Sequence, residues 1–345
     1  MISSSNRPSA APGRTSWWKA ALAAVSLVVL AACTGPSGSE SEEPADSTGG
    51  GGEGGGPAAS GDLTIAVITH GGDGDAFWSV AQNGAEQAGE DLGVEVNYTS
   101  DGDAAAQARL IDNAVAQGAS GIVVSMANPD ALQGSIEAAV EAGIPVITIN
   151  SGEDASVEFG ALAHVGQSEG VAGEGAGERF AEEGATKLLC VIHEAGNIGL
   201  TQRCDGAASS FGDVTELQVD LNNPTDVQAR IRGALQADPA IDGVLALNPQ
   251  VATAAVSAAG EAGSAAAVAT FDLSADVIAG IEAGDILFAV DQQQYLQGYL
   301  PVVMIKLFIE NANTIGGGLP VLTGPGFVDE SNAADVAEYA ERGTR

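Results

Sequence analysis

The chain has 345 residues and carries 46 Asp and Glu against 12 Lys and Arg, which gives a formal net charge of −34. A surface this acidic repels phosphate backbones and anionic lipid headgroups, so we expect no nucleic-acid partner. The three histidines are far apart in the sequence and form no zinc-binding spacing, and we expect neither a metal ion nor a cofactor.

Residues 1–32 have the pattern of a secretory signal peptide. Three basic residues precede an apolar run over 20–32, and this run is shorter than the roughly 20 residues that a membrane-spanning helix needs. The run ends in Leu30-Ala31-Ala32-Cys33, which resembles the lipobox of bacterial lipoproteins. The resemblance implies cleavage before Cys33 and lipidation of its thiol, so that the protein would lie outside the cytoplasm, anchored to the cell membrane. The alternative is an ordinary secretory signal that happens to contain a cysteine.

Residues 33–61 are predicted to form a flexible tether between the lipid and the folded part of the chain. After the cysteine, this segment is almost entirely Gly, Ser, Pro, Ala and acidic residues, and it has no apolar residue larger than alanine. Such a composition cannot bury a core. The chain from Asp62 onward is long enough for two α/β lobes.

The rest of the chain alternates between short runs rich in Val, Ile and Leu and longer alanine-rich stretches. Continuous apolar runs suit parallel strands that are covered on both faces, and repeated strand–helix units indicate a doubly wound α/β fold. The expected strands are 63–68, 94–99, 121–125, 145–149, 159–165, 187–192, 214–219, 243–247, 266–271 and 286–290. Helices are expected at 79–92, 103–117, 131–141 and 225–236, among others. Ten strands are too many for one open sheet, so we predict two parallel-sheet lobes.

Polar residues follow nearly every predicted strand. They are His70, Asn128, Asn150, His193, Asn222, Asn248, Asp272 and the pair Asp291-Gln292. In open α/β sheets, ligands bind beyond the carboxyl ends of the strands. Amides and carboxylates suit the neighbouring hydroxyls of a small polyol. Any one of these residues alone could instead cap the next helix, but the whole series predicts a binding site.

Two adjacent aromatic residues, Phe77 and Trp78, follow the first predicted strand in a chain with only 4% aromatic residues. We expect them to form a flat apolar face against the C–H side of a sugar ring, with Asp75 holding hydroxyl groups. The alternative is that they only pack the following helix onto the sheet.

From about Gly61 to Asn332 the chain resembles the type I periplasmic sugar-binding proteins, the ribose/galactose-binding group that feeds ABC importers. The motifs that carry the resemblance are Asp75-Ala76-Phe77-Trp78 with Gly84-Ala85, the run 143–150, Phe271-Asp272 and the run 291–299. The resemblance implies two doubly wound parallel-sheet lobes joined by a hinge of three crossings. The N-terminal lobe would hold residues 62–164 plus 292–319, and the C-terminal lobe would hold 165–291 plus 320–345.

The resemblance also implies a ligand site between the lobes. Its expected residues, together with those of the strand-end series, are Asp75, Phe77, Trp78, Asn128, Asn150, His193, Arg203, Asn222, Asn248, Asp272 and Gln292. Ribose binders usually carry Asp-Arg where this chain has Asn150-Ser151, which leaves the sugar's identity open. The implied function is a monomeric solute-binding lipoprotein that captures a neutral sugar or sugar alcohol and delivers it to an ABC permease. The alternative is a sensory module that binds a sugar-like signal.

The run Gly166-Gln167-Ser168-Glu169-Gly170 matches the G-x-S-x-G motif of serine hydrolases. The motif requires an acid and then a histidine downstream, but His193 follows Ser168 by only 25 residues and is the last histidine. This leaves no room for the intervening strands, so we do not expect an enzyme.

Cys190 and Cys204 remain if Cys33 is lipidated. Cys190 lies in a predicted strand, and Cys204 follows 14 residues later at the start of the next helical stretch. A strand and the helix that follows it are near neighbours, so we predict a disulfide bond between these cysteines in an oxidising compartment. Two buried free thiols are the alternative.

Overall fold

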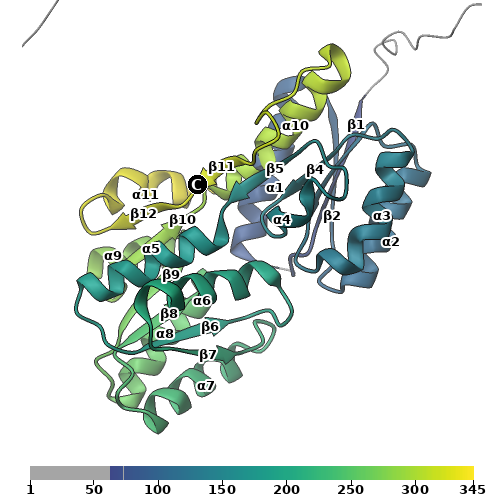
Figure 1. The fold of residues 1–345 in the computed structure, drawn as a ribbon. Coiled ribbons are helices and arrows are strands. Elements are labelled where there is room, and N and C mark those ends of the chain that lie inside the picture. The colour runs from purple at the N-terminus through teal and green to yellow at the C-terminus, as the bar shows by residue number, and fades with distance from the viewer. Residues whose placement is uncertain (1–62, 73) are drawn as a thin grey trace, which may run out of the picture. The chain divides into compact units, whose positions relative to one another are not determined.

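The computed structural model describes residues 63–72 and 74–345, which all belong to one compact unit (Figure 1). The predicted signal peptide, the lipidated Cys33 and the tether lie outside the described residues. Among the helices that the structure describes, none is long and apolar enough to cross a membrane.

Two six-stranded sheets form the framework of the molecule. The first has the order β11-β5-β4-β3-β1-β2 and only parallel pairings. Its strands are β1 (Thr64–Thr69), β2 (Glu95–Ser100), β3 (Gly121–Ser125), β4 (Val146–Ile149), β5 (Ala163–Gln167) and β11 (Val321–Gly324). The second has the order β12-β10-β9-β8-β6-β7, with β12 antiparallel to β10. Its strands are β6 (Leu188–Ile192), β7 (Val214–Gln218), β8 (Gly243–Ala246), β9 (Ala267–Phe271), β10 (Phe288–Asp291) and β12 (Gly326–Asp329).

Helices cover both faces of each sheet. The first lobe consists of the first sheet with α1 (Ala76–Leu92), α2 (Ala104–Ala116), α3 (Pro129–Glu141), α4 (Glu153–Ser156) and α10 (Gln294–Asn311). The second lobe consists of the second sheet with α5 (Glu169–Glu182), α6 (Ile198–Phe211), α7 (Pro224–Ala237), α8 (Pro249–Ala262), α9 (Ala275–Ala283) and α11 (Ala333–Glu341). The orders of five parallel strands correspond one to one between the sheets, so the two lobes repeat one doubly wound topology, as predicted. The lobes differ in the direction of the sixth strand, which is parallel in β11 and antiparallel in β12.

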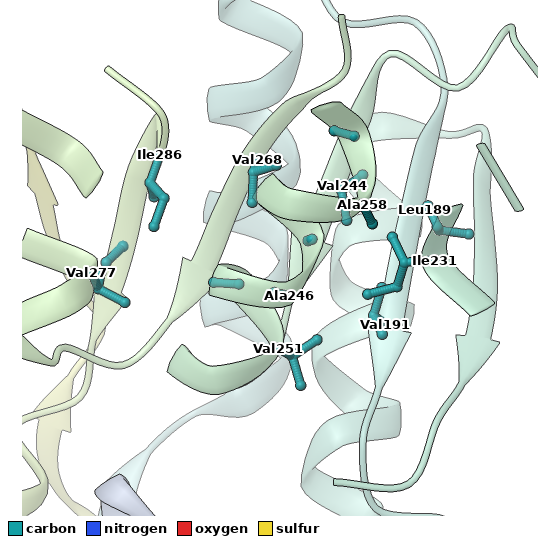
Figure 2. Close-up of a cluster of buried hydrophobic side chains, with 14 of the residues drawn as sticks. Leu189, Val191, Ile231, Val244, Ala246, Val251, Ala258, Val268, Val277 and Ile286 are labelled. Carbon is teal, nitrogen blue, oxygen red and sulfur yellow. The ribbon is translucent and has the colours of Figure 1, made fainter. Parts of the chain in front are cut away.

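Central strands are apolar throughout because both of their faces are buried. In β6, Leu189 and Val191 belong to the core cluster that Figure 2 shows, together with side chains of α7 and α8. Cys190 and Ile192 alternate with them and pack on the opposite face, against α5 and α6. This alternation explains why continuous Val, Ile and Leu runs in the sequence predicted the central strands correctly.

Helices α1 and α10 pack against each other at glycines. A Cβ atom added at Gly84 would lie 2.1 Å from the Tyr295 carbonyl oxygen, and one added at Gly298 would lie 1.9 Å from the Ala81 carbonyl oxygen. No side chain fits at these distances, so the two helices meet backbone to backbone. The chain leaves the second lobe after β10, and this packing holds the following helix, α10, against the first lobe.

The expected lobe boundaries at 164/165 and 319/320 need correction. Strand β5 continues to Gln167, and both β5 and β11 belong to the first sheet, where Gln167 is paired with Gly324. The chain therefore crosses between the lobes after Gln167, after Asp291 and after Gly324. Two residues of β5 lie beyond the apolar run, and the short β11 is partly exposed, so the hydrophobic pattern marked neither end.

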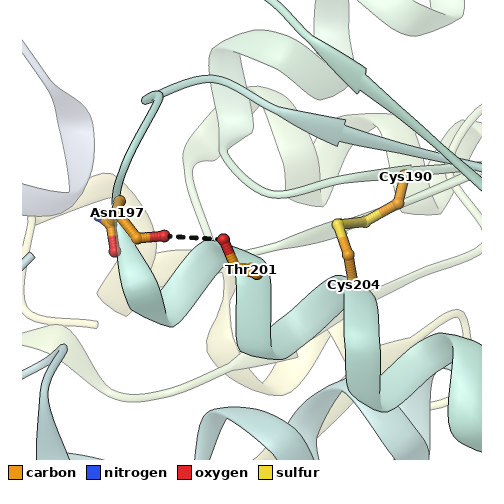
Figure 3. The surroundings of a disulfide bond; sticks show 4 residues. All are labelled: Cys190, Asn197, Thr201 and Cys204. Carbon is orange, nitrogen blue, oxygen red and sulfur yellow. Dashed lines mark hydrogen bonds between the residues drawn. A yellow bond between two sulfur atoms is a disulfide. The ribbon is translucent and has the colours of Figure 1, made fainter.

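A disulfide bond joins Cys190 and Cys204, with 5.9 Å between their Cα atoms (Figure 3). Cys190 lies in the middle of β6, and Cys204 lies in the second turn of α6 rather than at its start. Both cysteines are buried in the core of the second lobe. The bond therefore connects the sheet to the helix that carries Asn197 and Arg203 into the region described next.

Candidate functional site

A cavity of about 230 Å³ lies between the two lobes. It is smaller than the roughly 300–1,000 Å³ of pockets that hold drug-sized ligands. Six residues that line it directly follow strands or lie within two residues of a strand end: His70, Asn150, His193, Asn248, Asp272 and Gln292. The first two come from the first sheet and the others from the second, so the carboxyl ends of both sheets face one space.

Ten of the eleven predicted ligand-binding residues line this cavity. They are Asp75, Phe77, Trp78, Asn150, His193, Arg203, Asn222, Asn248, Asp272 and Gln292. Asn128 does not line it. Its side-chain oxygen accepts a hydrogen bond from the Ala131 backbone N–H at 3.2 Å and caps α3, and the adjacent Ala127 carbonyl accepts a hydrogen bond from Ile198 of the second lobe. Asn128 is thus a helix cap, the alternative that applied to every member of the series.

Gln292 joins the two lobes at the floor of the cavity. Its Nε2 donates to Asp272 Oδ1 at 2.7 Å, and its Oε1 accepts from Asn150 Nδ2 at 3.3 Å. Gln297, on α10, donates a second hydrogen bond to the same Oε1 at 2.9 Å. All of these side chains are buried. We call these hydrogen-bonded side chains the amide row. The row fixes the orientation of Asn150 from the first lobe and of Asp272 from the second.

Asn150 and Asp272 occupy equivalent places in the two lobes, directly after β4 and β9. Both have a left-handed backbone, with φ of 62° and 69°. Residues other than glycine rarely adopt this conformation, although Asn and Asp tolerate it best. Burial raises the pKa of Asp272 to about 7, while Arg203 and the hydrogen bond from Gln292 act in the opposite direction.

Phe77 and Trp78 form an apolar wall in the first turn of α1. The indole of Trp78 makes edge-on contacts with the rings of Phe77 and His70, with 4.7 Å between centroids in both pairs. Trp78 is only 7% exposed, belongs to the core cluster beneath α1 and lines the cavity. The indole therefore packs the helix onto the sheet, and its remaining surface lines the cavity, where contact with a sugar ring stays a prediction.

Asp75 begins α1 and also lines the cavity. Its Oδ1 accepts a hydrogen bond from the Phe77 N–H at 2.9 Å, the usual geometry of an N-terminal cap. Burial raises the pKa of Asp75 to about 6, and the nearby charge of Glu194 contributes in the same direction. A ligand O–H or N–H group that donates to this carboxylate would stabilise its charged form.

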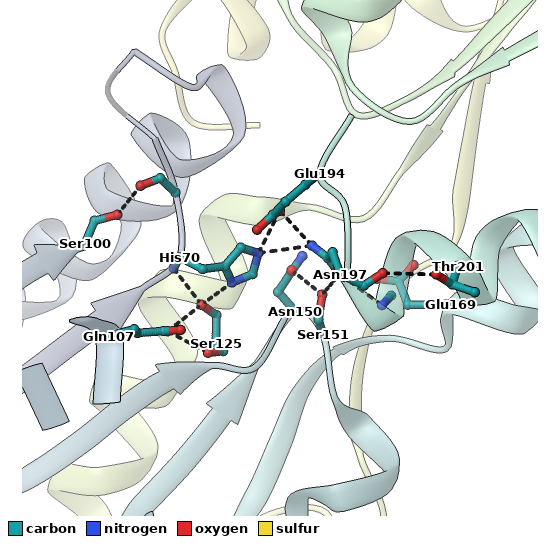
Figure 4. A network of polar contacts seen from close by, with 12 residues as sticks. His70, Ser100, Gln107, Ser125, Asn150, Ser151, Glu169, Glu194, Asn197 and Thr201 are labelled. Atoms are coloured by element: carbon teal, nitrogen blue, oxygen red, sulfur yellow. Dashed lines mark hydrogen bonds and ion pairs between the residues drawn. The ribbon is translucent and has the colours of Figure 1, made fainter. Parts of the chain in front are cut away.

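A polar network joins the lobes at one wall of the cavity (Figure 4). Asn197 directly precedes α6. Its Nδ2 lies 3.3 Å from His70 Nε2, and its Oδ1 accepts a hydrogen bond from Ser151 Oγ at 3.2 Å. His70 Nδ1 lies 2.7 Å from Ser125 Oγ, and burial lowers the pKa of the ring. A neutral ring that accepts from Asn197 at Nε2 carries its proton at Nδ1, so His70 donates to Ser125.

Arg203 lines the cavity with a guanidinium group. Its Nε and one terminal nitrogen donate to the two carboxylate oxygens of Glu169, at 2.6 and 2.8 Å. The guanidinium also lies over the ring of Phe271, 4.4 Å from its centroid. This bidentate pair is buried and joins α6 to the start of α5, so the cation is held rigidly beside the cavity.

Three polar residues that line the cavity belong neither to the predicted ligand-binding residues nor to the strand-end series: Ser151, Glu194 and Asn197. Each lies beyond the first polar residue after a strand, so a rule that reads only that first residue misses them. The loop between β6 and α6 corresponds in topology to the loop between β1 and α1, which contains Asp75. Comparing the two loops would have indicated Glu194 and Asn197. Within residues 63–72 and 74–345, no group of three or more His, Cys, Asp and Glu side chains is placed to hold a metal ion.

Comparisons with known proteins agree with this architecture. Residues 65–313 match the family model described as the periplasmic binding protein domain. The chain is 44% identical to a carbohydrate transporter of Acidothermus cellulolyticus whose crystal structure contains myo-inositol, with a TM-score of 0.81 over 83% of this chain and 100% of that one.

Among curated proteins, the D-apiose import binding protein of Actinobacillus succinogenes is 26% identical over 286 residues, which cover 80% of this chain and 91% of that protein. The xylose/arabinose-binding protein XylF of Sulfolobus acidocaldarius is 28% identical over 240 residues. That match covers 64% of this chain and 60% of the relative's length.

Proposed function

We propose that this chain, which belongs to the periplasmic binding protein family, is the solute-binding component of an ABC transporter. It captures a neutral sugar or cyclic polyol between its lobes and delivers it to a membrane permease. The observation that carries this proposal is the cavity itself, where buried amides and carboxylates from both sheets face one space of monosaccharide size.

The groups in the cavity suit a ring with several neighbouring hydroxyls. Asn248 is 2% exposed, and its Oδ1 accepts from the Gln250 N–H at 2.8 Å, so that the side chain is held with its amide at the cavity. Asp272 supplies a carboxylate acceptor, and Trp78 lines the same cavity with an apolar surface. Hydroxyls can thus be matched with donors and acceptors while the C–H face of the ring covers the indole.

We favour a cyclic polyol such as myo-inositol as the first candidate ligand. The support is the 44% identical carbohydrate transporter, whose structure contains myo-inositol. The uncharged Asn150-Ser151 pair, where ribose binders usually carry Asp-Arg, fits a ligand other than ribose. Pentoses remain in the candidate set because the curated relatives include import proteins for D-apiose and for ribose.

The chain acts by binding rather than by catalysis. Ser168, the centre of the G-x-S-x-G run, lies directly before α5 and does not line the cavity. Among the side-chain hydrogen bonds of the described residues, none joins Ser168 to a histidine, and His164 lies beside Thr148 instead, 2.9 Å from its hydroxyl oxygen. The solved structure at 44% identity is likewise described as that of a carbohydrate transporter.

The protein works outside the cytoplasm, attached to the cell membrane through a lipid on Cys33, as a monomer. The Leu30-Ala31-Ala32-Cys33 sequence supports the anchor, and the disulfide bond fits an oxidising compartment. Metabolic labelling with a radioactive fatty acid tests the anchor directly. We expect incorporation into the wild type and none into Cys33→Ser.

A thermal-shift screen of the secreted part tests the binding function. The panel comprises myo-inositol, ribose, xylose, arabinose and galactose. A ligand at 100 times its Kd stabilises the folded state by about 2.7 kcal/mol, which is large enough to raise the melting temperature measurably. We expect at least one member to do so in wild type and to lose that effect in Asp272→Ala. If no sugar or cyclitol changes the melting temperature, the proposal is wrong.

A further inference from the structure

The cavity contains more negative than positive charge. Asp75 of the first lobe and Glu194 and Asp272 of the second lobe line it with carboxyl groups. Among the described residues that line it, Arg203 is the only Lys or Arg. The balance of these groups decides which ionic forms of a polyol the closed cavity accepts.

The positive charge of Arg203 is already neutralised. Both oxygens of Glu169 accept from its guanidinium, and Gln167 Nε2 donates to the same carboxylate at 2.9 Å. A ligand carboxylate or phosphate that approached the remaining N–H groups of Arg203 would lie close to the negative charge of Glu169. The cation therefore attracts a second anion less than an unpaired arginine would.

The two histidines of the cavity do not supply a cation either. Burial lowers the pKa of His70, and it lowers the pKa of His193 to about 3, with Arg203 and His70 acting in the same direction. Burial therefore disfavours the protonated, charged form of both rings. An anionic ligand would therefore meet carboxylates and neutral groups.

Asp75 and Glu194 come from opposite lobes and face the same cavity. Asp75 Oδ1 accepts from the Phe77 N–H, and Glu194 Oε2 accepts from Asn197 Nδ2 at 2.9 Å and lies 3.7 Å from His70 Nε2. Glu194 Oε1 makes no hydrogen bond to the described residues, whereas the Asp75 carboxylate also accepts from the Trp78 backbone. The charge of Glu194 raises the pKa of Asp75, and a ligand donor or cation between the two carboxylates would offset this repulsion.

Asp272 offers a further acceptor for ligand donors in the same cavity. Asp272 is 3% exposed, and its Oδ1 accepts from Gln292. Its Oδ2 has no hydrogen-bond partner among the described residues, although the side chain lines the cavity. A buried carboxylate oxygen of this kind is satisfied by a ligand hydroxyl or ammonium group.

Building on the function proposed above, we propose that the cavity accepts polyols that carry an amine and rejects those that carry a carboxylate or phosphate. Amino sugars and aminocyclitols therefore belong to its ligand class. Asp75 and Glu194 are the residues that select for the ammonium group, because they approach it from the two lobes.

Calorimetric titration with ring-matched compounds tests the selection. One series is glucose, glucosamine and glucuronate, and the other is myo-inositol, an inosamine and an inositol monophosphate. In at least one series we expect the amine to bind at least as tightly as the neutral ring. We expect the anion of that series to bind at least about 100-fold more weakly than the neutral ring, which corresponds to two tenfold steps of 1.4 kcal/mol. Binding of the neutral ring together with its anion at similar affinity overturns the inference and leaves the proposed function intact. Binding of none of the six compounds overturns both.

Three single substitutions locate the selecting residues. Asp75→Asn keeps a good helix cap and Glu194→Gln keeps an acceptor for Asn197, while each removes one charge. Each should lower the affinity ratio of amine to neutral ring by about tenfold, the effect of one charge-assisted hydrogen bond. Glu183→Gln removes an exposed charge outside the cavity and should leave the ratio unchanged. An equal fall in all three variants would mean that overall net charge, not the cavity, attracts the amine.

Discussion

Trp78 performs two tasks that are usually assigned to different residues. It packs α1 onto the first sheet, and its remaining exposed surface lines the cavity. The aromatic pair was recognised in the sequence because aromatic residues are rare in this chain. Its packing partners, above all His70, could not be predicted, because they depend on how the β1–α1 loop folds back on the sheet.

The fluorescence of Trp78 should report ligand binding. The other tryptophans, Trp17 and Trp18, lie in the predicted signal peptide, so Trp78 is the only one in the secreted part. A ligand ring against the indole excludes water, so the emission should shift to shorter wavelength and acrylamide quenching should fall as the ligand saturates. A ligand whose binding is established by calorimetry but which alters neither signal would remove Trp78 from the site.

Asp272 should make stability depend on pH. Its carboxyl has a pKa of about 7 in the folded protein, above the ordinary value of 3.8, because burial disfavours the charge. The folded state therefore binds more protons than the unfolded state between about pH 4 and pH 7, and this contribution to the free energy of unfolding is lost as pH rises through that range. Asp272→Asn has no such titration, while its amide oxygen can still accept from Gln292 and its backbone tolerates positive φ.

We expect urea unfolding to show Asp272→Asn gaining stability relative to wild type as pH rises from 4 to 7.5. One titrating group limits the gain to about 1.4 kcal/mol per pH unit. The neutral histidines titrate in both proteins, so their effects cancel in the difference. A difference that stays constant over this range would show that Asp272 ionises normally.

The elements differ in how clearly the sequence marks them. Central strands such as β3 and β6 are apolar at every position because helices cover both of their faces, and they were predicted within a residue or so. The four-residue strands β11 and β12 are partly exposed and were missed. They lie at the outer edges of the two sheets, and the chain crosses between the lobes for the third time between them. An expectation based on burial therefore misplaced the lobe boundary there.

The disulfide bond between β6 and α6 should contribute to the stability of the second lobe. Its cysteines are separated by 14 positions, and closing a loop of about 15 residues contributes about 3 kcal/mol in the chain-entropy account. Reduced protein should therefore unfold at lower urea concentration than oxidised protein, whereas reductant should not affect a Cys190→Ala/Cys204→Ala variant. In denatured, unreduced Cys33→Ser protein, thiol reagents should find no free thiol. Two reactive thiols would contradict the bond.

At the scale of the whole molecule, the strand-end rule found most of the cavity because the carboxyl ends of both sheets converge. Asn150 and Asp272, which follow equivalent strands, illustrate this. The same rule wrongly included Asn128, because the first turn of α6 contacts the neighbouring Ala127. Which strand ends stay open depends on how the lobes meet, and that information is not present in any single strand.

The amide row at Gln292 continues through Asn150 and Ser151 to the network at Asn197, so these contacts join the lobes along one side of the cavity. A hydrogen bond from Gln250 Nε2 to the Gly74 carbonyl, at 3.3 Å, also connects the second lobe to the first. These contacts are polar, as expected for lobes that separate to admit a ligand. We expect one polyol molecule to occupy this cavity.

Calorimetric titration of myo-inositol into a cavity-filling variant and its control tests that claim most directly. Gly72 lines the cavity, and a Cβ atom there would meet only Asn222 Oδ1, at 4.0 Å, so Gly72→Phe adds a ring without a backbone clash. Gly134 is exposed on α3 outside the cavity, and Gly134→Phe is the matched control. We predict one binding site per chain in wild type and in Gly134→Phe, and no measurable binding to Gly72→Phe. Equal affinity in all three proteins would place the ligand elsewhere and contradict the account.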